Sequence, residues 1–349
     1  MSATTISHDA EKTLPETIME GGHVDEKVLA HSHDADDAMK AFMSHEGQVL
    51  DLDEETNKRL LRRIDWNLMP VSNAFRQSKQ ISQSPTLTPP QILCVVYGLN
   101  YLDKTTISYA SIMGLQTDIG LHGDDYSWLA SMFYFGYIAW EYPTSRLLQR
   151  LPLGKYSAIN IILWGTTLAC FAAVDNYAGA IAVRFFLGVF EAAVTPGFAL
   201  LTSQWYTKAE QGTRTGIWFS FNGFAQIFGG LVAYGIARGT ELHGSSIAPW
   251  KIVFLFTGLL TVVIGIVFFF TVPDNQLNAR FLSKEDRLLA IERVRVNQQG
   301  IGNKHFKWYQ LREALTDPLT WAFVFYALVA DIPNGNQARY ALLCPTKTY

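Results

Sequence analysis

The sequence predicts an all-α protein that crosses a membrane several times. Of its 349 residues, 49% are hydrophobic and only 17% are charged, whereas a soluble protein has about 25% charged residues. The apolar residues also gather in runs of around 20, roughly the length that a helix needs to span ~30 Å of hydrocarbon. Together these observations indicate a polytopic membrane protein and exclude an ordinary soluble domain.

Residues 1–57 are expected to form a disordered, acidic, cytoplasmic tail. Up to residue 60 the chain has 14 Asp or Glu and 5 Lys or Arg, a net charge of −9, so the overall −3 leaves +6 for the remainder. Such a segment has too few apolar side chains to offset the entropy of ordering. No secretory signal is recognisable in it. His31 and His33 lack the further ligands that a metal site needs, so no metal site is predicted.

An amphipathic pre-helix at Leu60–Pro70 opens the segment 58–92, and six membrane spans follow within 93–272. Each span is an apolar run bounded by polar or charged residues, as expected for a helix that crosses a bilayer. The six are predicted at 91–113, 126–149, 154–174, 177–204, 214–237 and 249–272.

A cytoplasmic central loop is expected at 273–317. Within it, Ser283 and Asp286 have the spacing of a capping box, and the apolar residues that follow, up to Val294, have helical spacing. This pattern predicts an amphipathic helix along the cytoplasmic face.

Two segments do not fit a regular series of spans. Residues 72–92 form an anomalous polar, proline-containing insert directly before the first span. In 318–349 the apolar run extends only from Trp321 to Ile332, before Asn334–Arg339 interrupts it. Twelve helical residues rise only ~18 Å, too little to cross ~30 Å of hydrocarbon. We therefore expect an incomplete seventh helix, as in a truncated start of a second half.

The loops predict the orientation of the spans. Thirteen Lys or Arg residues lie in the loops after spans two, four and six, against two, Arg238 and Lys251, in the loops after spans one, three and five. The positive-inside rule then places the N-terminus in the cytoplasm.

Three polar residues of the first span, Asn100, Asp103 and Lys104, can share one helix face because they are three and four residues apart. An Asp or Lys at a helix centre costs roughly 2.5–3.5 kcal/mol on insertion scales, so such residues face a bundle interior or an aqueous path. The functional interpretation makes Asp103 a proton-titrating carboxylate and Lys104 its partner or an anion site. The alternative is a structural ion pair that fixes the first span to a neighbour.

Arg184 and Glu191 of the fourth span are seven residues apart, which is two helical turns, and so lie on one face. A guanidinium offers a rigid fork to a carboxylate and keeps its charge, which suits an anion site or a proton-coupling partner. The alternative is a buried Arg–Glu bridge between helices, and for Glu191 this structural role is favoured.

Two further groups of residues are candidates for weaker reasons. In the fifth span, Asn222 and Gln226 form a polar stripe that could bind a substrate, and the glycines around them are expected to permit close helix packing. Glu141, in the second span, is expected to form an ionic latch near Arg146 at the following loop.

Soluble enzyme chemistry is absent from the sequence. No Walker loop, HExxH, G-x-S-x-G or Cys-x-x-Cys pattern is present, so no ATPase, metalloprotease or serine hydrolase is predicted, and no cofactor. The three cysteines, Cys94, Cys170 and Cys344, are expected to be apolar packing residues. Any transport would have to draw on an ion gradient.

Several motifs occur in a characteristic order. They are Tyr101–Gly114, Glu141–Pro143, Gln149–Lys155, Arg184–Glu191, Pro196–Gly197, Val272–Asn275 and Ala279–Leu282. Over roughly residues 58–335 the chain resembles the N-terminal half of the major facilitator superfamily, in the fungal anion:cation symporter branch typified by allantoate permease.

The resemblance implies a six-helix N-terminal bundle and a substrate site near the midplane between two halves. It implies proton-coupled import of a small organic anion across the plasma membrane, with the anion, protons and the lipid bilayer as partners and no nucleic acid. It points to Asp103, Lys104, Arg184 and Glu191 as embedded functional charges, and to the loop from Arg150 to Lys155 as the gate.

One departure concerns that gate. The acidic G-x-x-x-D-R loop of the superfamily is here Thr144–Arg150, which includes Arg146 but no Asp. The gating salt bridge usual for the superfamily is therefore not expected in its usual form.

The resemblance, together with the embedded charges, implies a proton symporter for a small organic anion of the allantoate or ureide, vitamin or carboxylate type, working by alternating access. Asp103 or Glu191 would titrate, and Arg184 or Lys104 would attract the anion. The alternative is a non-transporting truncated membrane fragment, from a misread gene model or a retained intron at 72–92, because a site between two halves cannot be built from one.

Overall fold

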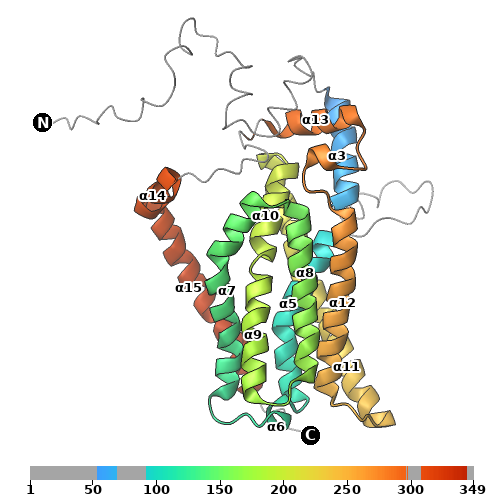
Figure 1. Cartoon of the computed structure of the whole chain (residues 1–349), viewed down its shortest axis with the longest axis vertical. Helices are drawn as coiled ribbons and strands as arrows, with labels where there is room; N and C mark the ends of the chain where they lie inside the picture. Colours follow the sequence, from blue (N-terminus) through green and yellow to red (C-terminus); the bar gives the residue numbers. More distant parts are fainter. Residues whose placement is uncertain (1–52, 69–91, 296, 298–307, 344–349) are drawn as a thin grey trace, which may run out of the picture. The chain divides into compact units, whose positions relative to one another are not determined.

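The computed structural model describes residues 53–68, 92–295, 297 and 308–343, and within these ranges it leaves the side chains of Trp66 and 331–343 undescribed. The predicted disordered tail lies outside these ranges up to residue 52, and the predicted polar insert lies outside them up to residue 91. Every regular element in the described part of the chain is helical, as the sequence predicts (Figure 1).

Seven long helices form the bundle, and they coincide with the six predicted spans. Five of the six predicted ranges each match one helix. The helices are α5 (Ile92–Ile112), α7 (Asp125–Arg150), α8 (Leu153–Cys170), α9 (Tyr177–Glu191), α10 (Val194–Trp205), α11 (Lys208–His243) and α12 (Pro249–Thr271).

The fourth predicted span is divided into α9 and α10 by a turn at Ala192 and Ala193. Pro196 explains the break, because it has no N–H to donate to the carbonyl one turn earlier and its ring clashes there. The fifth span is longer than predicted, since α11 begins at a capping box between Thr207 and Glu210.

Three spans are apolar and long enough to cross a membrane by length and composition alone: Leu153–Ala173, Tyr177–Trp205 and Pro249–Thr271. The helices α5, α7 and α11 have 21, 26 and 36 residues, so each is also long enough. These three helices are less apolar than the three spans, although the span Tyr177–Trp205 itself carries Arg184 and Glu191. The six predicted spans thus comprise three that are more apolar and three that are less so.

Other helices connect and cover the ends of the bundle. The amphipathic α3 and the neighbouring α13 lie at one end and α6 at the other (Figure 1). These helices are α3 (Glu54–Leu68), α6 (Leu115–Asp118), η3 (Phe171–Ala173), η4 (Gln276–Asn278), α13 (Lys284–Arg295) and α14 (Trp308–Thr316). The amphipathic character predicted for α13 is not found, because it buries Asp286 and Arg293 as well as apolar residues.

The seventh apolar run is short, as predicted, but the backbone stays helical through Asn334–Arg339. Helix α15 (Pro318–Leu343) continues through this segment, although its apolar part, Pro318–Ala330, is short. Polar residues alone do not end a helix, and Gly335 costs only about 1 kcal/mol relative to Ala.

Glycines set the distances between helices where α7 crosses α9. A Cβ atom on Gly136 would lie 2.0 Å from the carbonyl oxygen of Phe185, and one on Gly188 would lie 2.0 Å from that of Phe133. Each helix therefore presents a glycine to the backbone of the other. Close backbone approach of this kind is typical of helix packing in membranes.

The same close approach occurs between α8 and α12. A Cβ atom on Gly258 would lie 2.4 Å from the backbone nitrogen of Ala169, and one on Gly165 would lie 2.8 Å from that of Val262. The predicted packing role of the α11 glycines is only partly correct. Gly229 packs against Leu102, but nothing lies near Gly223.

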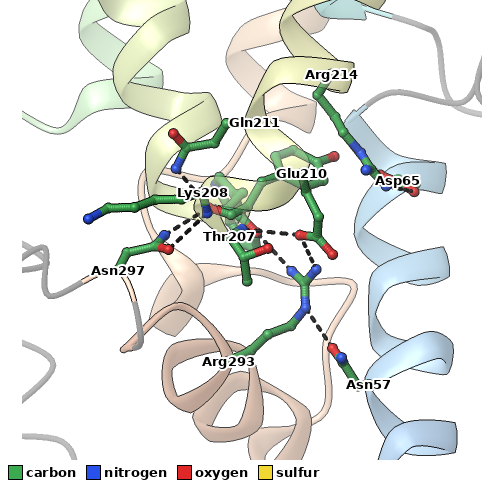
Figure 2. A network of polar contacts seen from close by, with 11 residues as sticks. Asn57, Asp65, Thr207, Lys208, Glu210, Gln211, Arg214, Arg293 and Asn297 are labelled. Atoms are coloured by element: carbon green, nitrogen blue, oxygen red, sulfur yellow. Dashed lines mark hydrogen bonds and ion pairs between the residues drawn. The ribbon is translucent and has the colours of Figure 1, made fainter.

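At the end of the bundle that carries α3 and α13, a polar network joins these helices to α11 (Figure 2). Arg293 of α13 is its centre, with a side chain 2% exposed. Its guanidinium donates to the side chain of Asn57 at 2.8 Å, to the carbonyl oxygen of Trp205 at 3.2 Å, and to Glu210. One arginine therefore connects α3, the end of α10 and the start of α11.

Neighbouring contacts strengthen this connection. Arg214 of α11 donates two hydrogen bonds to Asp65 of α3, at 2.9 and 3.4 Å, a bidentate geometry that is among the stronger ion pairs. Arg63 of α3 donates to Asp286 of α13 at 2.6 Å, and Asp286 is itself held by the predicted cap, with its N–H on Ser283 Oγ at 3.1 Å. The amphipathic α3 also buries Leu60, Ile64 and Leu68.

Burial alone would raise the pKa of Glu210, but the Arg293 guanidinium and the hydrogen bonds from Thr207 outweigh it and lower the pKa below the ordinary 4.5. A carboxyl with a lowered folded-state pKa contributes stability above its unfolded value and loses this contribution as the pH falls through the folded value. The network is thus expected to weaken in acid.

We expect Gly188→Ala to destabilise the protein by about 1–3 kcal/mol, the usual cost of overpacking, because the α7 backbone must move away from the new methyl group. Thermal unfolding of the purified protein in detergent measures the effect. Gly223→Ala is the matched control and should cause no loss, since nothing lies within 4 Å of its Cβ position. Equal melting temperatures for the two variants would contradict the close crossing.

Arg293→Met should cost about 3 kcal/mol, because it leaves Glu210 without its buried partner. Arg295→Met makes the same change two residues further along α13, where the side chain is 63% exposed and pairs with Glu292. That control should change the free energy of unfolding by under about 0.5 kcal/mol. Similar losses for both variants would show that the network does not hold the helices together.

Candidate functional site

Five polar or charged residues that the sequence singles out lie together inside the bundle. α5 contributes Asn100, Asp103 and Lys104, and α9 contributes Arg184 and Glu191. Four of the five residues are at most 4% exposed, and only Lys104 reaches solvent, with a side chain 41% exposed. We call these five residues the charged cluster.

Glu191 is held by two donors from α5. The amide of Asn100 donates to its Oε1 at 2.8 Å, and the Lys104 ammonium lies 3.4 Å from the same oxygen. The other oxygen, Oε2, is buried and has no hydrogen-bond partner among the described residues. The structural role that the sequence favours for Glu191 is therefore present, but its partner is Lys104 and not Arg184.

Asp103 is held by a residue that sequence reasoning missed. The indole Nε1 of Trp164, on α8, donates to Oδ2 of Asp103 at 2.8 Å. Oδ1 is buried and lacks a partner in the described part of the chain. Trp164 lies in a largely apolar run, but a buried indole N–H normally finds a hydrogen-bond partner. That rule could have marked Trp164 as a candidate.

Arg184 lies beside aromatic rings. Its Cζ is 5.4 Å from the ring centroid of Phe171 and 5.9 Å from that of Phe254, both cation–π distances. Its Nε and Nη2 are buried and have no hydrogen-bond partner in the residues described. Within the same residues no carboxylate forms an ion pair with it at 4.0 Å or less. The alternative of a direct Arg184–Glu191 bridge is therefore not found.

The charged cluster combines two carboxylates with two cations in apolar surroundings. Isolated charges are very costly to bury, so this balance keeps the cluster stable. The partnerless atoms, Asp103 Oδ1, Glu191 Oε2 and two guanidinium nitrogens, are the groups with unused capacity to bind a proton or an anion.

Among the described residues, no hydrogen bond joins the predicted polar stripe of α11, Asn222 and Gln226, to the charged cluster. Gln226 is exposed and donates to the hydroxyl of Tyr101 at 3.0 Å. The side-chain oxygen of Asn222 is buried and has no partner among the described residues. Asn222 therefore retains an unused acceptor, whereas Gln226 is engaged.

The predicted gate residues occupy the α7–α8 end of the bundle. Glu141 has one buried oxygen without a hydrogen-bond partner among the described residues, and Arg146 donates to Gln149 at 3.0 Å. Arg150 is exposed. Lys155 contacts α12, because its N–H donates to Asp274 Oδ1 at 3.0 Å and its Nζ lies 3.7 Å from Oδ2. Asp274 thus supplies an acid at a gate whose own motif lacks one.

A cavity of about 400 Å³ lies at the other end of the bundle, away from the charged cluster. Asp175 and Lys251 form an ion pair at its edge, 2.6 Å apart. Its lining is Asp118, Val174, Asp175, Ser246, Ile247, Ala248, Trp250 and Lys251.

A family model described as Major Facilitator Superfamily matches residues 93–335. Among curated proteins, an uncharacterized transporter of Schizosaccharomyces pombe, C417.10, is 42% identical over 84% of this chain and 53% of its own length. The allantoate permease of Saccharomyces cerevisiae is 36% identical over 90% of this chain and 54% of its own length. The thiamine pathway transporter THI73 of the same yeast is 33% identical over 82% and 50%.

The chain thus spans about half the length of the curated relatives it matches. Those relatives are named as transporters or permeases, not as enzymes.

We expect Lys104→Met to destabilise the protein by roughly 2 kcal/mol, because Glu191 loses its ion-pair partner. The loss should be smaller than the 3–5 kcal/mol typical of fully buried pairs, since the Lys104 side chain is 41% exposed. Thermal unfolding in detergent measures it.

The control is a double-mutant cycle with Glu191→Gln, which removes the buried charge. The double variant should be more stable than the sum of the single losses predicts. Additive losses would contradict an interaction between the two side chains.

Proposed function

The chain belongs to the Major Facilitator Superfamily, and from this premise we propose that it serves the proton-coupled import of a small organic anion by alternating access. The observation that carries the proposal is the charged cluster, in which two acids and two cations lie together, all but Lys104 buried, and several of their atoms have no hydrogen-bond partner among the described residues. Ionisable residues inside a membrane bundle usually mark a substrate path or a proton relay.

Charge balance supports coupling between the anion and a proton. With both acids ionised, the two carboxylates and the two cations sum to zero. An arriving anion would give the cluster a net negative charge in a medium where an unbalanced charge is costly. Protonation of Asp103 or Glu191 would restore neutrality. The anion and the proton are therefore expected to bind best together, which is the basis of symport.

The contacts also favour roles for individual residues. Two donor nitrogens of Arg184 have no hydrogen-bond partner among the described residues, and its charge cannot be titrated away, so it suits the anion. Lys104 is engaged by Glu191 and would become available once Glu191 is protonated. In this scheme Asp103 or Glu191 takes the proton, and Arg184, with Lys104 as a second cation, attracts the anion.

The substrate class that we propose is an allantoate-like ureide, a vitamin or a carboxylate. The named functions of two relatives, an allantoate permease and a thiamine pathway transporter, support this range. The basic residues near α3 and α13 support a cytoplasmic position for that end of the bundle and for the N-terminus. A plasma-membrane location completes the proposal.

A second candidate is a membrane-embedded bundle that does not transport. Sites in this superfamily lie between two six-helix halves, and this chain spans about half the length of its relatives, so the described residues supply one side of such a site. The two candidates differ in whether supplying a second half produces uptake.

The test is uptake of labelled allantoate by yeast that lacks its own allantoate permease. The chain is expressed alone and together with the second half of the S. cerevisiae permease, and uptake is measured at several external pH values. We expect uptake by the combined halves to be stronger in acid. Absence of uptake from both, with each polypeptide present in the membrane, would favour the second candidate.

In the same assay Asp103→Asn should abolish the pH dependence of uptake, because the amide cannot take a proton. Asp124→Asn makes the same change at an exposed position outside the charged cluster and should leave the pH dependence intact. Unchanged pH dependence in Asp103→Asn would refute a proton-binding role for this residue.

A further inference from the structure

The two oxygens of the Asp103 carboxyl have different surroundings. Oδ2 accepts the hydrogen bond from Trp164 Nε1 at 2.8 Å, and Oδ1 has no partner in the described part of the chain. Asp103 is 1% exposed and Trp164 is 0% exposed, so bulk water does not compete for this bond.

An indole can donate a hydrogen bond but cannot accept one. A proton on Oδ2 would turn it into a hydroxyl oxygen, which is a weaker acceptor than a carbonyl oxygen, and would therefore weaken the bond from Trp164. With the proton on Oδ1, Oδ2 remains a carbonyl oxygen and keeps the bond from Trp164. The same bond can therefore persist in the charged and the neutral state.

We propose that Trp164 is a positioning residue that orients the Asp103 carboxyl so that Oδ1 alone takes and releases the proton. This inference rests on the proton-binding role of Asp103 in the proposed function. In the step itself, the Oδ1 carboxylate accepts H⁺ to form O–H, and release breaks that bond. No other group is consumed.

The other groups that act on Asp103 are charged. Arg184 and Glu191 interact electrostatically with it from α9, where the Glu191 carboxyl is also a close side-chain neighbour, and Lys104 does so from the helix of Asp103 itself. From α7, Tyr126 and Tyr134 interact electrostatically with Arg184. The influence of the charged groups changes whenever an anion binds or a carboxyl is protonated. The indole is neutral and does not titrate, so its hydrogen bond is the constant contact of the carboxyl.

The packing of α8 keeps the indole in place. Gly165, next to Trp164 in sequence, lies so close to α12 that a Cβ atom would be 2.8 Å from the backbone nitrogen of Val262. A helix held at this distance has little freedom to rotate, and a fully buried indole has no space to swing away.

The test is pH-difference infrared spectroscopy on the purified chain in lipid nanodiscs, which requires no transport. The carboxylic C=O band that is absent from Asp103→Asn identifies the protonated Asp103. In Trp164→Phe the aromatic bulk remains but the donor is lost, so this band should shift to higher wavenumber. Trp218→Phe is the matched control, because Trp218 is 2% exposed and its Nε1 has no partner among the described residues.

A shift in Trp164→Phe without a shift in Trp218→Phe supports the proposal. An Asp103 band at the same wavenumber in Trp164→Phe and in the wild type overturns it, while leaving the proton-binding role of Asp103 intact. If the spectrum of the wild type has no pH-dependent band that disappears in Asp103→Asn, both the proton-binding role of Asp103 and the positioning of the proton are overturned.

A second measurement on the wild type guards against poor folding of Trp164→Phe. The chain has nine tryptophans, and ¹⁵N labelling of their indoles gives one N–H resonance for each. The chemical shift of one resonance should change with the same pH midpoint as the infrared band. This change should be lost in Asp103→Asn. If no indole resonance follows that midpoint, the proposal is overturned.

Discussion

Charge balance inside an apolar bundle is the constraint on which the site depends. Asp103, Glu191, Lys104 and Arg184 are held away from bulk water to different degrees, and no single charge among them would be tolerated in isolation. The balance is achieved through different contacts: an ion pair for Glu191, an indole for Asp103 and aromatic rings for Arg184. Only one of these contacts is an ion pair, and Asp103 and Arg184 keep polar atoms without a hydrogen-bond partner among the described residues.

The helix crossings make this arrangement possible. Paired glycines let α7 and α9 approach to backbone contact at Gly136 and Gly188, and glycines do the same for α8 and α12. These crossings position α9, which carries Arg184, and α8, which carries Trp164. Small residues far from the chemistry therefore determine where the chemical groups lie.

The sequence was sufficient to predict the helices and most of the charged cluster. A long apolar run predicts a membrane span. A charged residue within such a run is unfavourable enough to identify Asp103 and Arg184 as candidate functional residues. Sequence spacing also shows which residues share a face of one helix, but it does not show which neighbour that face meets. For this reason the Trp164 contact and the aromatic neighbours of Arg184 were missed, and the engagement of Gln226 with Tyr101 was not foreseen. The split of α9 from α10 depends on Pro196 and could have been predicted.

The network around Arg293 also bears on how the polypeptide enters the membrane. Arg214 and Arg293 are among the thirteen basic residues whose positions predict the orientation under the positive-inside rule. In the folded chain the same guanidinium groups form ion pairs with Asp65 and Glu210. Charges whose distribution predicts how the nascent chain is inserted are thus neutralised inside the folded one. Reversal of the topology would first require these ion pairs to open, so the folded structure opposes it.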